Sequence, residues 1–362
     1  MKLEIKKIRL NELDSFVQSE TYNRFLNVPI TPERAKSFIH NPHAKPDDVV
    51  LFLGFVEGKL VAFRSLFAGI VTTKNEQIRF GWCSGNWVHP DFRRNGFSEQ
   101  LLKEAHSDWN GKLMFTNYAP SSENLYLKTG WFQSIYEFAG VRGYLFPKTR
   151  KLLPAANKNM GLKLLFSVID FFIAVVSTIR LWFFDSENNP DYRLETIQFP
   201  DEQCFESIQK NNSTFVFNRN ANELKWIFQY PWISKIESTI SKKYPFSSYS
   251  SSFIYQTVKI FNKNNFAGFF IFSVKEGHLK TLYFNVPSGI ENKVANYLKQ
   301  FCIKHKIELV TVYKTEIALQ FFAQKFPFLH TKKYGQKIYS SFEINVEKKY
   351  QFQDGDGDVI FT

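Results

Sequence analysis

The stretch from Gly81 to Ser98 constrains the fold of this chain more than any other, because a strand pattern, a turn and a helix start follow one another in it. We expect a buried strand that ends at Val88, a turn at Pro90 and then a helix. The apolar residues on one face of that helix are Phe97, Leu101, Leu102 and Ala105. The connecting loop, residues 93–98, is short and contains a glycine.

Such a loop can bind an anion. The first N–H groups of a helix have no partner inside the helix and lie at the positive end of its dipole. Gly96 would let a phosphate approach the main chain where a Cβ would block it, and Ser98 is nearly as small. An ordinary strand-to-helix turn is the alternative interpretation.

The loop resembles the acyl-CoA signature of the GNAT superfamily of N-acetyltransferases, which reads Arg or Gln, two residues, Gly, one residue, then Gly or Ala. Arg93, Gly96 and Ser98 occupy these positions, and Ser98 departs mildly from the pattern. The resemblance implies that the strand contacts pantetheine and that the loop holds pyrophosphate. The residues it assigns to acyl-CoA binding are Val88, Arg93, Arg94, Asn95, Gly96, Phe97, Ser98 and Asn117.

A second segment, Leu125 to Trp131, resembles the second GNAT signature, a helix that carries a tyrosine and ends at a glycine. In that family the tyrosine faces the thioester sulfur and can protonate the departing thiolate, and Tyr126 matches its position. A phenol with a pKa of about 10 stays protonated at neutral pH and can donate a proton to a thiolate. The alternative is a tyrosine that only packs on a helix face.

The order of expected elements in residues 1–147 is the GNAT order: strand, two helices, three strands, helix, strand, helix, strand. The expected elements are a strand at 2–10, helices at 11–18 and 31–39, strands at 49–56, 60–70, 78–88 and 113–116, helices after 97 and around 126, and a strand at 138–146. The resemblance places the acceptor pocket near Tyr22 and Phe25.

Residues 148–190 form a connector of different character. Basic residues precede an apolar stretch, Leu164 to Phe184, which Asp170 and Arg180 interrupt. The uncharged part is too short to span a bilayer core of about 30 Å. We expect either a helix packed between two domains or an interfacial helix that contacts a membrane through residues 163–184.

Residues 191–362 repeat the same element order, which predicts a second GNAT-like domain. Residues 287–291 lack the loop signature and place Glu291 where phosphate oxygens would lie, and residues 319–322 contain no tyrosine. The fold class is therefore a mixed α/β sheet in two GNAT-like domains, of which the second is degenerate. Residues 225–232, rich in aromatic side chains, are expected to pack, and residues 354–358, which superficially resemble a calcium loop without its closing glutamate, are expected to form a polar turn.

Net charge and cysteine content limit the classes of molecule that the protein is expected to bind. The net charge of +12 favours anionic partners, but lysine and arginine are spread along the chain, so a basic solvated surface is expected and nucleic acid is not. Cys83, Cys204 and Cys302 are far apart, which argues against disulfides and zinc and fits a cytoplasmic protein without a metal. The N-terminus has no signal-peptide core.

These features predict an acyl-CoA-dependent N-acyltransferase, with acetyl-CoA as the expected donor and a primary amine that attacks the thioester directly in a ternary complex. Tyr126 is the expected acid. The base is open: Gly81 to Val88 carries no carboxylate, which leaves Glu57, another loop group, a water chain or solvent. The alternatives are a transferase with another activated donor, such as aminoacyl-tRNA, and a non-catalytic protein that binds a partner or a membrane. A small amine, an amino sugar and a peptide N-terminus all remain possible acceptors.

Overall fold

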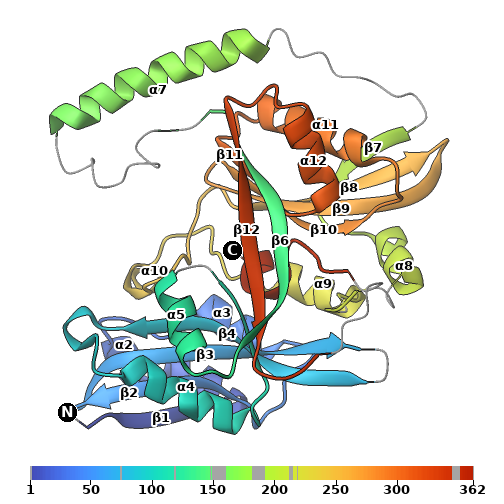
Figure 1. The fold of residues 1–362 in the computed structure, drawn as a ribbon. Coiled ribbons are helices and arrows are strands. Elements are labelled where there is room, and N and C mark those ends of the chain that lie inside the picture. Colours follow the sequence, from blue (N-terminus) through green and yellow to red (C-terminus); the bar gives the residue numbers. More distant parts are fainter. Residues whose placement is uncertain are drawn as a thin grey trace. The chain divides into compact units, whose positions relative to one another are not determined.

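The computed structural model describes residues 2–73, 76–117, 120–146, 148, 160–181, 192–211, 215–217, 219–344 and 351–361 (Figure 1). The strands of the first half are β1 (Glu4–Arg9), β2 (Val49–Val56), β3 (Lys59–Thr72), β4 (Gln77–Val88), β5 (Leu113–Thr116) and β6 (Gln133–Tyr144). Its helices are α1 (Leu13–Gln18), α2 (Glu20–Arg24), α3 (Pro32–Ile39), α4 (Phe97–Asp108) and α5 (Pro120–Lys128), with a 3-10 turn, η2 (Pro90–Phe92), after β4.

The second half repeats this order, as the sequence predicts. Its strands are β7 (Tyr192–Ile197), β8 (Ile254–Asn262), β9 (Asn265–Lys275), β10 (His278–Asn285), β11 (Leu309–Val312) and β12 (His330–Ser340). Its helices are α8 (Glu202–Asn211), α9 (Ala221–Gln229), α10 (Thr239–Lys243), α11 (Glu291–Lys304) and α12 (Thr315–Ala323), followed by the 3-10 helix η5 (Gly357–Phe361). Between the halves lies α7 (Met160–Leu181).

The chain forms two compact units, and neither is continuous in sequence. Unit 1 comprises Met1–Glu137, Phe205–Phe253 and Gln336–Thr362, and unit 2 comprises Phe138–Cys204 and Ile254–Gly335. The boundaries at 147 and 190 divide the sequence by element order, and as sequence domains they stay a prediction. The compact units follow a different division, because each takes in chain from the other half.

The sheets show where this exchange occurs. In unit 1 the strand order is β1-β2-β3-β4-β5-β12, and in unit 2 it is β6-β11-β10-β9-β8-β7. β12 pairs antiparallel with β5, so that Ile338 faces Thr116, and β6 pairs antiparallel with β11, so that Tyr144 faces Leu309. Each half ends in a strand, as the predicted element order requires, although β6 spans Gln133–Tyr144 rather than 138–146. Each final strand pairs with a strand of the other half, because a local hydrophobic pattern specifies a strand but not its partner.

Two layers of helix cover the sheet of unit 1. The predicted apolar face of α4 is buried against β2, β3 and β4. On the other face, Phe38 of α3 packs against Phe67 of β3 and against Trp232. The indole N–H groups of Trp226 and Trp232 both donate to Ser37, at 2.6 and 2.9 Å. The aromatic stretch that contains these tryptophans therefore packs on α3, as expected.

Unit 2 has its own apolar core beneath α11 and α12. The C-terminal end of α7 is attached to it, since the Ser177 hydroxyl donates to Leu145 O at 2.9 Å and Arg180 donates to Phe328 O at 3.2 Å. Along one face of α7 the large apolar side chains are exposed: Leu162, Leu165, Val168, Phe171, Phe172, Val175, Val176 and Ile179. Among the described residues no helix has both the length and the apolarity needed to cross a membrane. The two interpretations of the connector both stay predictions.

Candidate functional site

A β-bulge interrupts β4 where this strand leaves β5. The two strands pair in parallel only at Gly81 and Trp82, opposite Leu113 and Met114. The pairing of β4 with β3 then slips, so that Ser84 is an extra residue without a partner in the ladder. Bulges bend a strand and free its main-chain groups, and sheets bind ligands where neighbouring strands part at their carboxyl ends. The carboxyl end of β4 also leads into the loop 93–98.

The loop has the backbone that the sequence predicts for an anion site. Gly96 is the N-cap of α4 with φ 74°, and Arg94 has φ 68°. A Cβ at Gly96 would meet no atom within 4 Å, so the space in front of the glycine is open. The main chain of the first turn begins to bond internally at Gln100, whose N–H donates to Gly96 O at 3.0 Å. The amides before it are those that a helix leaves without internal partners.

The side chains of the loop divide into exposed and buried groups. Arg93, Arg94 and Asn95 are exposed, whereas Phe97 is buried in the core and offers a ligand only its main chain. The Asn95 amide donates to Phe92 O at 3.0 Å and closes the loop on itself. His89 accepts from the N–H of Asp91 at 3.3 Å and so takes part in the turn that follows β4.

Val88 and Asn117 occupy different places from the loop. Val88 ends β4, pairs with Ala62 and packs against the core, so its main chain lies beside the open end of the strand. Oδ1 of the Asn117 side chain accepts from the main-chain N–H of Lys337 at 2.6 Å. This bond holds β12 beside the end of β5, so the Asn117 side chain is engaged in the exchanged strand. Its role in cofactor binding stays a prediction.

Tyr126 lies in the core on the same face of the sheet as α4. It is 4% exposed, and its ring stacks on Phe115 with the centroids 4.0 Å apart. Its hydroxyl accepts a hydrogen bond of 2.5 Å from Nη1 of Arg64 on β3. Burial raises the pKa of Tyr126 above its ordinary value, and the guanidinium of Arg64 opposes that rise. Burial also raises the pKa of the neighbouring Cys83 thiol.

Arg64 connects the tyrosine to the start of α4. It is fully buried, and its Nη2 donates to Asn86 Oδ1 at 3.3 Å and to Ser98 O at 3.4 Å. The Ser98 hydroxyl in turn donates to Asn86 Oδ1 at 2.7 Å. Among the ion pairs of the described residues none includes Arg64. A buried cation without an acidic partner is costly, so its position beside Tyr126 calls for a functional explanation.

The opposite face of the bulge is also polar. Nη2 of Arg34, on α3, donates to Ser84 O at 2.5 Å and to the Ser84 hydroxyl. That hydroxyl donates to Asp358 Oδ2 at 2.7 Å. Asp358 belongs to η5, and a Cβ on its neighbour Gly357 would clash with both Trp82 of β4 and Thr116 of β5. The C-terminal segment therefore crosses the point where β4 and β5 part.

This segment is buried, which the interpretation as a polar turn does not anticipate. Asp354, Asp356 and Asp358 are 2%, 2% and 8% exposed. Arg219 supports the turn by donating to Gly355 O and Gly357 O, both at 3.1 Å. Burial raises the pKa of Asp356 to about 7, although Arg219 acts in the opposite direction.

Sequence reasoning missed Arg34, Arg64, Ser84 and Asp358 as parts of the site. Ser84 lies in the predicted strand that ends at Val88, and the small polar residues next to it are a signal in the sequence that could have indicated a site there. Asp358 is 274 residues away from it, and no local pattern joins the two. The placement of Tyr22 and Phe25 near the acceptor stays a prediction. Tyr22 is buried and its hydroxyl donates to Ile30 O at 2.7 Å, so it serves the local packing.

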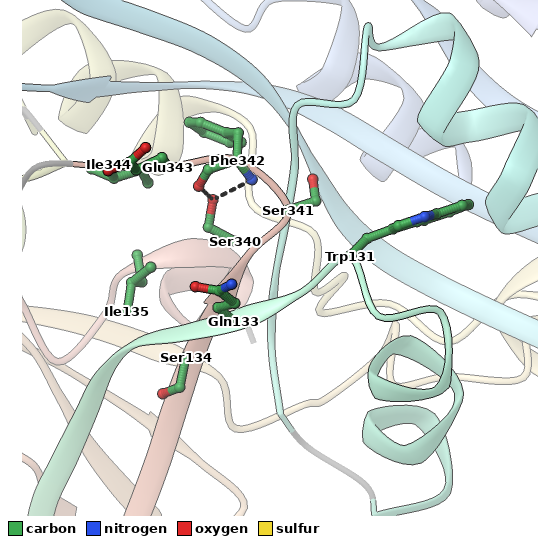
Figure 2. Close-up of a pocket in the computed structure, with 9 residues that line it drawn as sticks. All are labelled: Trp131, Gln133, Ser134, Ile135, Ser340, Ser341, Phe342, Glu343 and Ile344. Atoms are coloured by element: carbon green, nitrogen blue, oxygen red, sulfur yellow. Dashed lines mark hydrogen bonds between the residues drawn. The ribbon is translucent and has the colours of Figure 1, made fainter.

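A separate open pocket of about 530 Å³ lies elsewhere in unit 1, between the start of β6 and the chain after β12 (Figure 2). Its lining residues are Trp131, Gln133, Ser134, Ile135, Ser340, Ser341, Phe342, Glu343 and Ile344. Ser340 pairs with Met114 near the beginning of β5, whereas the loop 93–98 follows the end of β4. This pocket is therefore not the predicted donor site. In the described part of the chain no group of three or more His, Cys, Asp or Glu residues could hold a metal ion.

Comparison with known proteins agrees with the GNAT resemblance predicted for residues 1–147. Residues 4–133 match the family model of the acetyltransferase (GNAT) domain. No curated protein matches the chain. A protein of unknown function from Enterococcus faecalis, described as a probable N-acyltransferase, has a similar fold, with a TM-score of 0.50 at 10% identity over 94% of this chain and 72% of that one.

Two further solved structures align over most of the chain. A tandem GNAT protein from the clavulanic acid biosynthesis pathway has a TM-score of 0.49 at 11% identity, over 95% of this chain and all of that one. A GCN5-related N-acetyltransferase from Anabaena variabilis has a TM-score of 0.48 at 11% identity, over 94% of this chain and 72% of that one.

Proposed function

We propose, on the premise that residues 4–133 form a GNAT acetyltransferase domain, that this protein transfers an acyl group from acyl-CoA, with acetyl-CoA as the donor, to a primary amine. One observation carries the proposal. In a single unit, β4 parts from β5 at a bulge and leads into a loop whose left-handed Gly96 opens the start of α4. This is the geometry that an acyl-CoA needs for its pantetheine and pyrophosphate.

The loop would hold the donor through its main chain and its charge. The free amides at the start of α4 suit phosphate oxygens, and the exposed Arg93 and Arg94 add positive charge next to them. Val88 and the residues before it would bond pantetheine along the open edge of β4. Asn95 would keep the loop closed rather than contact the donor with its side chain.

Tyr126 would protonate the thiolate when the C–S bond breaks, and Arg64 would make that step possible. A phenol has a pKa of about 10 and a thiol of about 8.5, so transfer to a thiolate is uphill, and burial of the phenol makes it more so. The Arg64 guanidinium at 2.5 Å would stabilise the phenolate that the transfer leaves. This role accounts for a buried cation with no acidic partner among the described ion pairs.

Calorimetric titration of acetyl-CoA into the purified protein tests the donor site. We expect wild-type binding that is lost when Arg93 and Gly96 are both changed to Glu. Lys103→Glu is the matched control, because Lys103 makes only an exposed pair with Glu99 on the same helix, and we expect it to bind as the wild type does. A folded wild type that does not bind acetyl-CoA would contradict the proposal. It would favour another donor, such as aminoacyl-tRNA, or a non-catalytic role.

The same proposal includes the acceptor class and the compartment. The acceptor is a primary amine that attacks the thioester directly in a ternary complex. A cytoplasmic location is supported by the three cysteines, all of them buried and far apart in the sequence. No observation on the described residues favours a transferred group longer than acetyl.

A further inference from the structure

We infer that the C-terminal segment completes the acceptor side of this site and that Asp358 is the base that takes a proton from the acceptor's ammonium group. This inference rests on the proposed acyl transfer and supplies the group that the mechanism otherwise lacks. It starts from the buried acidic run 354–358, which the donor site does not use.

The two faces of β4 at the bulge have different neighbours. Cys83 belongs to the core that also contains α4 and Tyr126, so this face is the donor side. The next residue, Ser84, bonds to Arg34 of α3 and to Asp358, so that face is the opposite one. An acyl group held where β4 and β5 part has CoA on the first face. We place the attacking amine on the second face, the side on which Asp358 bonds to Ser84.

The position of Asp358 is fixed by several contacts. Ser84 Oγ donates to Oδ2 at 2.7 Å. Gly357 fits between Trp82 and Thr116, where any side chain would clash. Phe361, at the end of η5, stacks on Trp232 with the centroids 4.2 Å apart and the planes within 5°. Because the chain is fixed on both sides of Asp358, its carboxyl group is preorganised for proton transfer.

The described groups around Asp358 include a cation, two neutral side chains and two further acids. Arg34 is the cation nearby, and it reaches Asp358 through Ser84 and also donates to the Tyr244 hydroxyl at 2.9 Å. Burial raises the pKa of both Cys83 and Tyr244, so both stay neutral at pH 7. On its own segment the neighbouring acids are Asp354 and Asp356, and Asp356 lies with Arg219. Asp358 is thus the acidic group of this segment that bonds to the bulge, through Ser84.

The proton balance is complete with these groups. Asp358 removes a proton from the ammonium, and the free amine attacks the acyl carbon. As the C–N bond forms and the C–S bond breaks, Tyr126 gives its proton to sulfur. The nitrogen of the adduct still carries one surplus proton, which leaves as the amide forms and replaces the proton that Tyr126 gave to sulfur. The protonated Asp358 returns the first proton to solvent.

The test uses the full chain with acetyl-CoA and three amines: a diamine, an amino sugar and a short peptide with a free N-terminus. The acetylated product is measured by mass spectrometry, which separates transfer from hydrolysis. For Asp358→Asn we expect kcat/KM to fall about 10²–10⁴-fold and the acidic limb of its pH profile to disappear. Binding of acetyl-CoA, measured by calorimetry, should stay within about twofold of the wild type, because Asp358 lies on the other face.

Two further variants separate catalysis from packing. Asp354→Asn removes another buried carboxyl group from the same segment, and we expect less than about a tenfold loss of transfer. Ser84→Ala keeps the carboxylate and removes its hydrogen bond, which should move the acidic limb to higher pH, since a carboxylate that loses a donor is protonated more easily.

The outcomes are distinct. Asp358→Asn with wild-type transfer, or with the acidic limb retained, overturns the assignment of the base. Equal losses in Asp358→Asn and Asp354→Asn, with acetyl-CoA binding lost in both, show a structural role and also overturn it. A wild type that binds acetyl-CoA but transfers to none of the amines contradicts an acceptor site on this face. Only the absence of acetyl-CoA binding by the wild type would remove the proposed function itself.

Discussion

Both halves of the chain build the same bulge, but the extra residue is polar in the first half and apolar in the second. In the first half the parallel pairing of β4 ends at Trp82 and the extra residue is Ser84. In the second half the parallel pairing of β10 ends at Lys280 and the extra residue is Leu282. Leu282 is fully buried and apolar, whereas Ser84 bonds to Arg34 and Asp358. The bulge is a property of the fold, and the chemistry depends on which side chains reach it.

The helix starts differ in the same way. Before α4 the left-handed Gly96 opens onto exposed arginines. Before α11 the Glu291 carboxylate accepts from the N–H of Gly289 at 3.1 Å, so an acid already uses the position where an anion would bind. Near α12, which follows β11 as α5 follows β5, Phe321 is buried against Phe328. Unit 2 thus keeps the scaffold but has an apolar residue at its bulge and an acid at the start of α11.

The largest effect should follow from giving unit 1 the apolar character of unit 2 at Arg64. We expect Arg64→Met to lower kcat about 10²–10³-fold, because Tyr126 loses its charged donor, and to destabilise the fold by about 1–3 kcal/mol through the polar atoms left unpaired. Steady-state kinetics and thermal unfolding measure the two effects. If Arg64 acts through the phenol, Arg64→Met should lower kcat little further in a protein that already carries Tyr126→Phe. An equal loss of kcat in both backgrounds would contradict this and leave Arg64 a packing role.

Tyr126→Phe sharpens the comparison at the residue that α12 lacks. We expect kcat to fall about 10²-fold while acetyl-CoA binding is unchanged, since the ring still stacks on Phe115 and only the proton donor is lost. The loss should be smaller for donors whose leaving thiol is more acidic, because such a thiolate needs less help. Tyr339→Phe is a useful control, because Tyr339 stacks on the other side of Phe115 and its hydroxyl bonds to Glu123 instead. Unchanged kcat in Tyr126→Phe would remove the phenol from the mechanism without affecting the assignment of the donor loop.

These comparisons show what the sequence could and could not predict. The element order of both halves follows from hydrophobic period and turn residues, and the predicted ranges for β2 and β5 coincide with the structure. The exchange of β6 and β12 could not be predicted, because either edge offers the same main-chain hydrogen bonds to a final strand. Donor-side residues stand next to one another in sequence, so a short motif finds them. Arg64 and Asp358 reach the site only through tertiary packing, and no local pattern distinguishes them from other charged residues.

The buried acid of the C-terminal segment predicts a pH effect on the stability of unit 1. Burial raises the pKa of Asp356 to about 7, above its value of about 4 in an unfolded chain. The folded protein therefore holds this proton where the unfolded chain has lost it. The contribution of Asp356 is fully present below about pH 4 and is lost as the pH rises towards 7. We expect Asp356→Asn to flatten the fall in unfolding temperature over this range, and parallel wild-type and variant curves would contradict the assignment.

The smallest effect, and the cleanest comparison, concerns the two glycines before the helices. Gly96 and Gly289 have φ of 74° and 89°, and a Cβ on either would meet no atom within 4 Å. Alanine at either position should cost about 1 kcal/mol of stability through backbone strain alone. If only the first loop binds the donor, Gly96→Ala should also weaken acetyl-CoA binding several-fold, whereas Gly289→Ala should leave it unchanged. Equal weakening of acetyl-CoA binding by both variants would contradict the assignment of the donor to the first loop alone. A loss of stability in Gly96→Ala without any change in binding would show that the phosphates do not lie at Gly96.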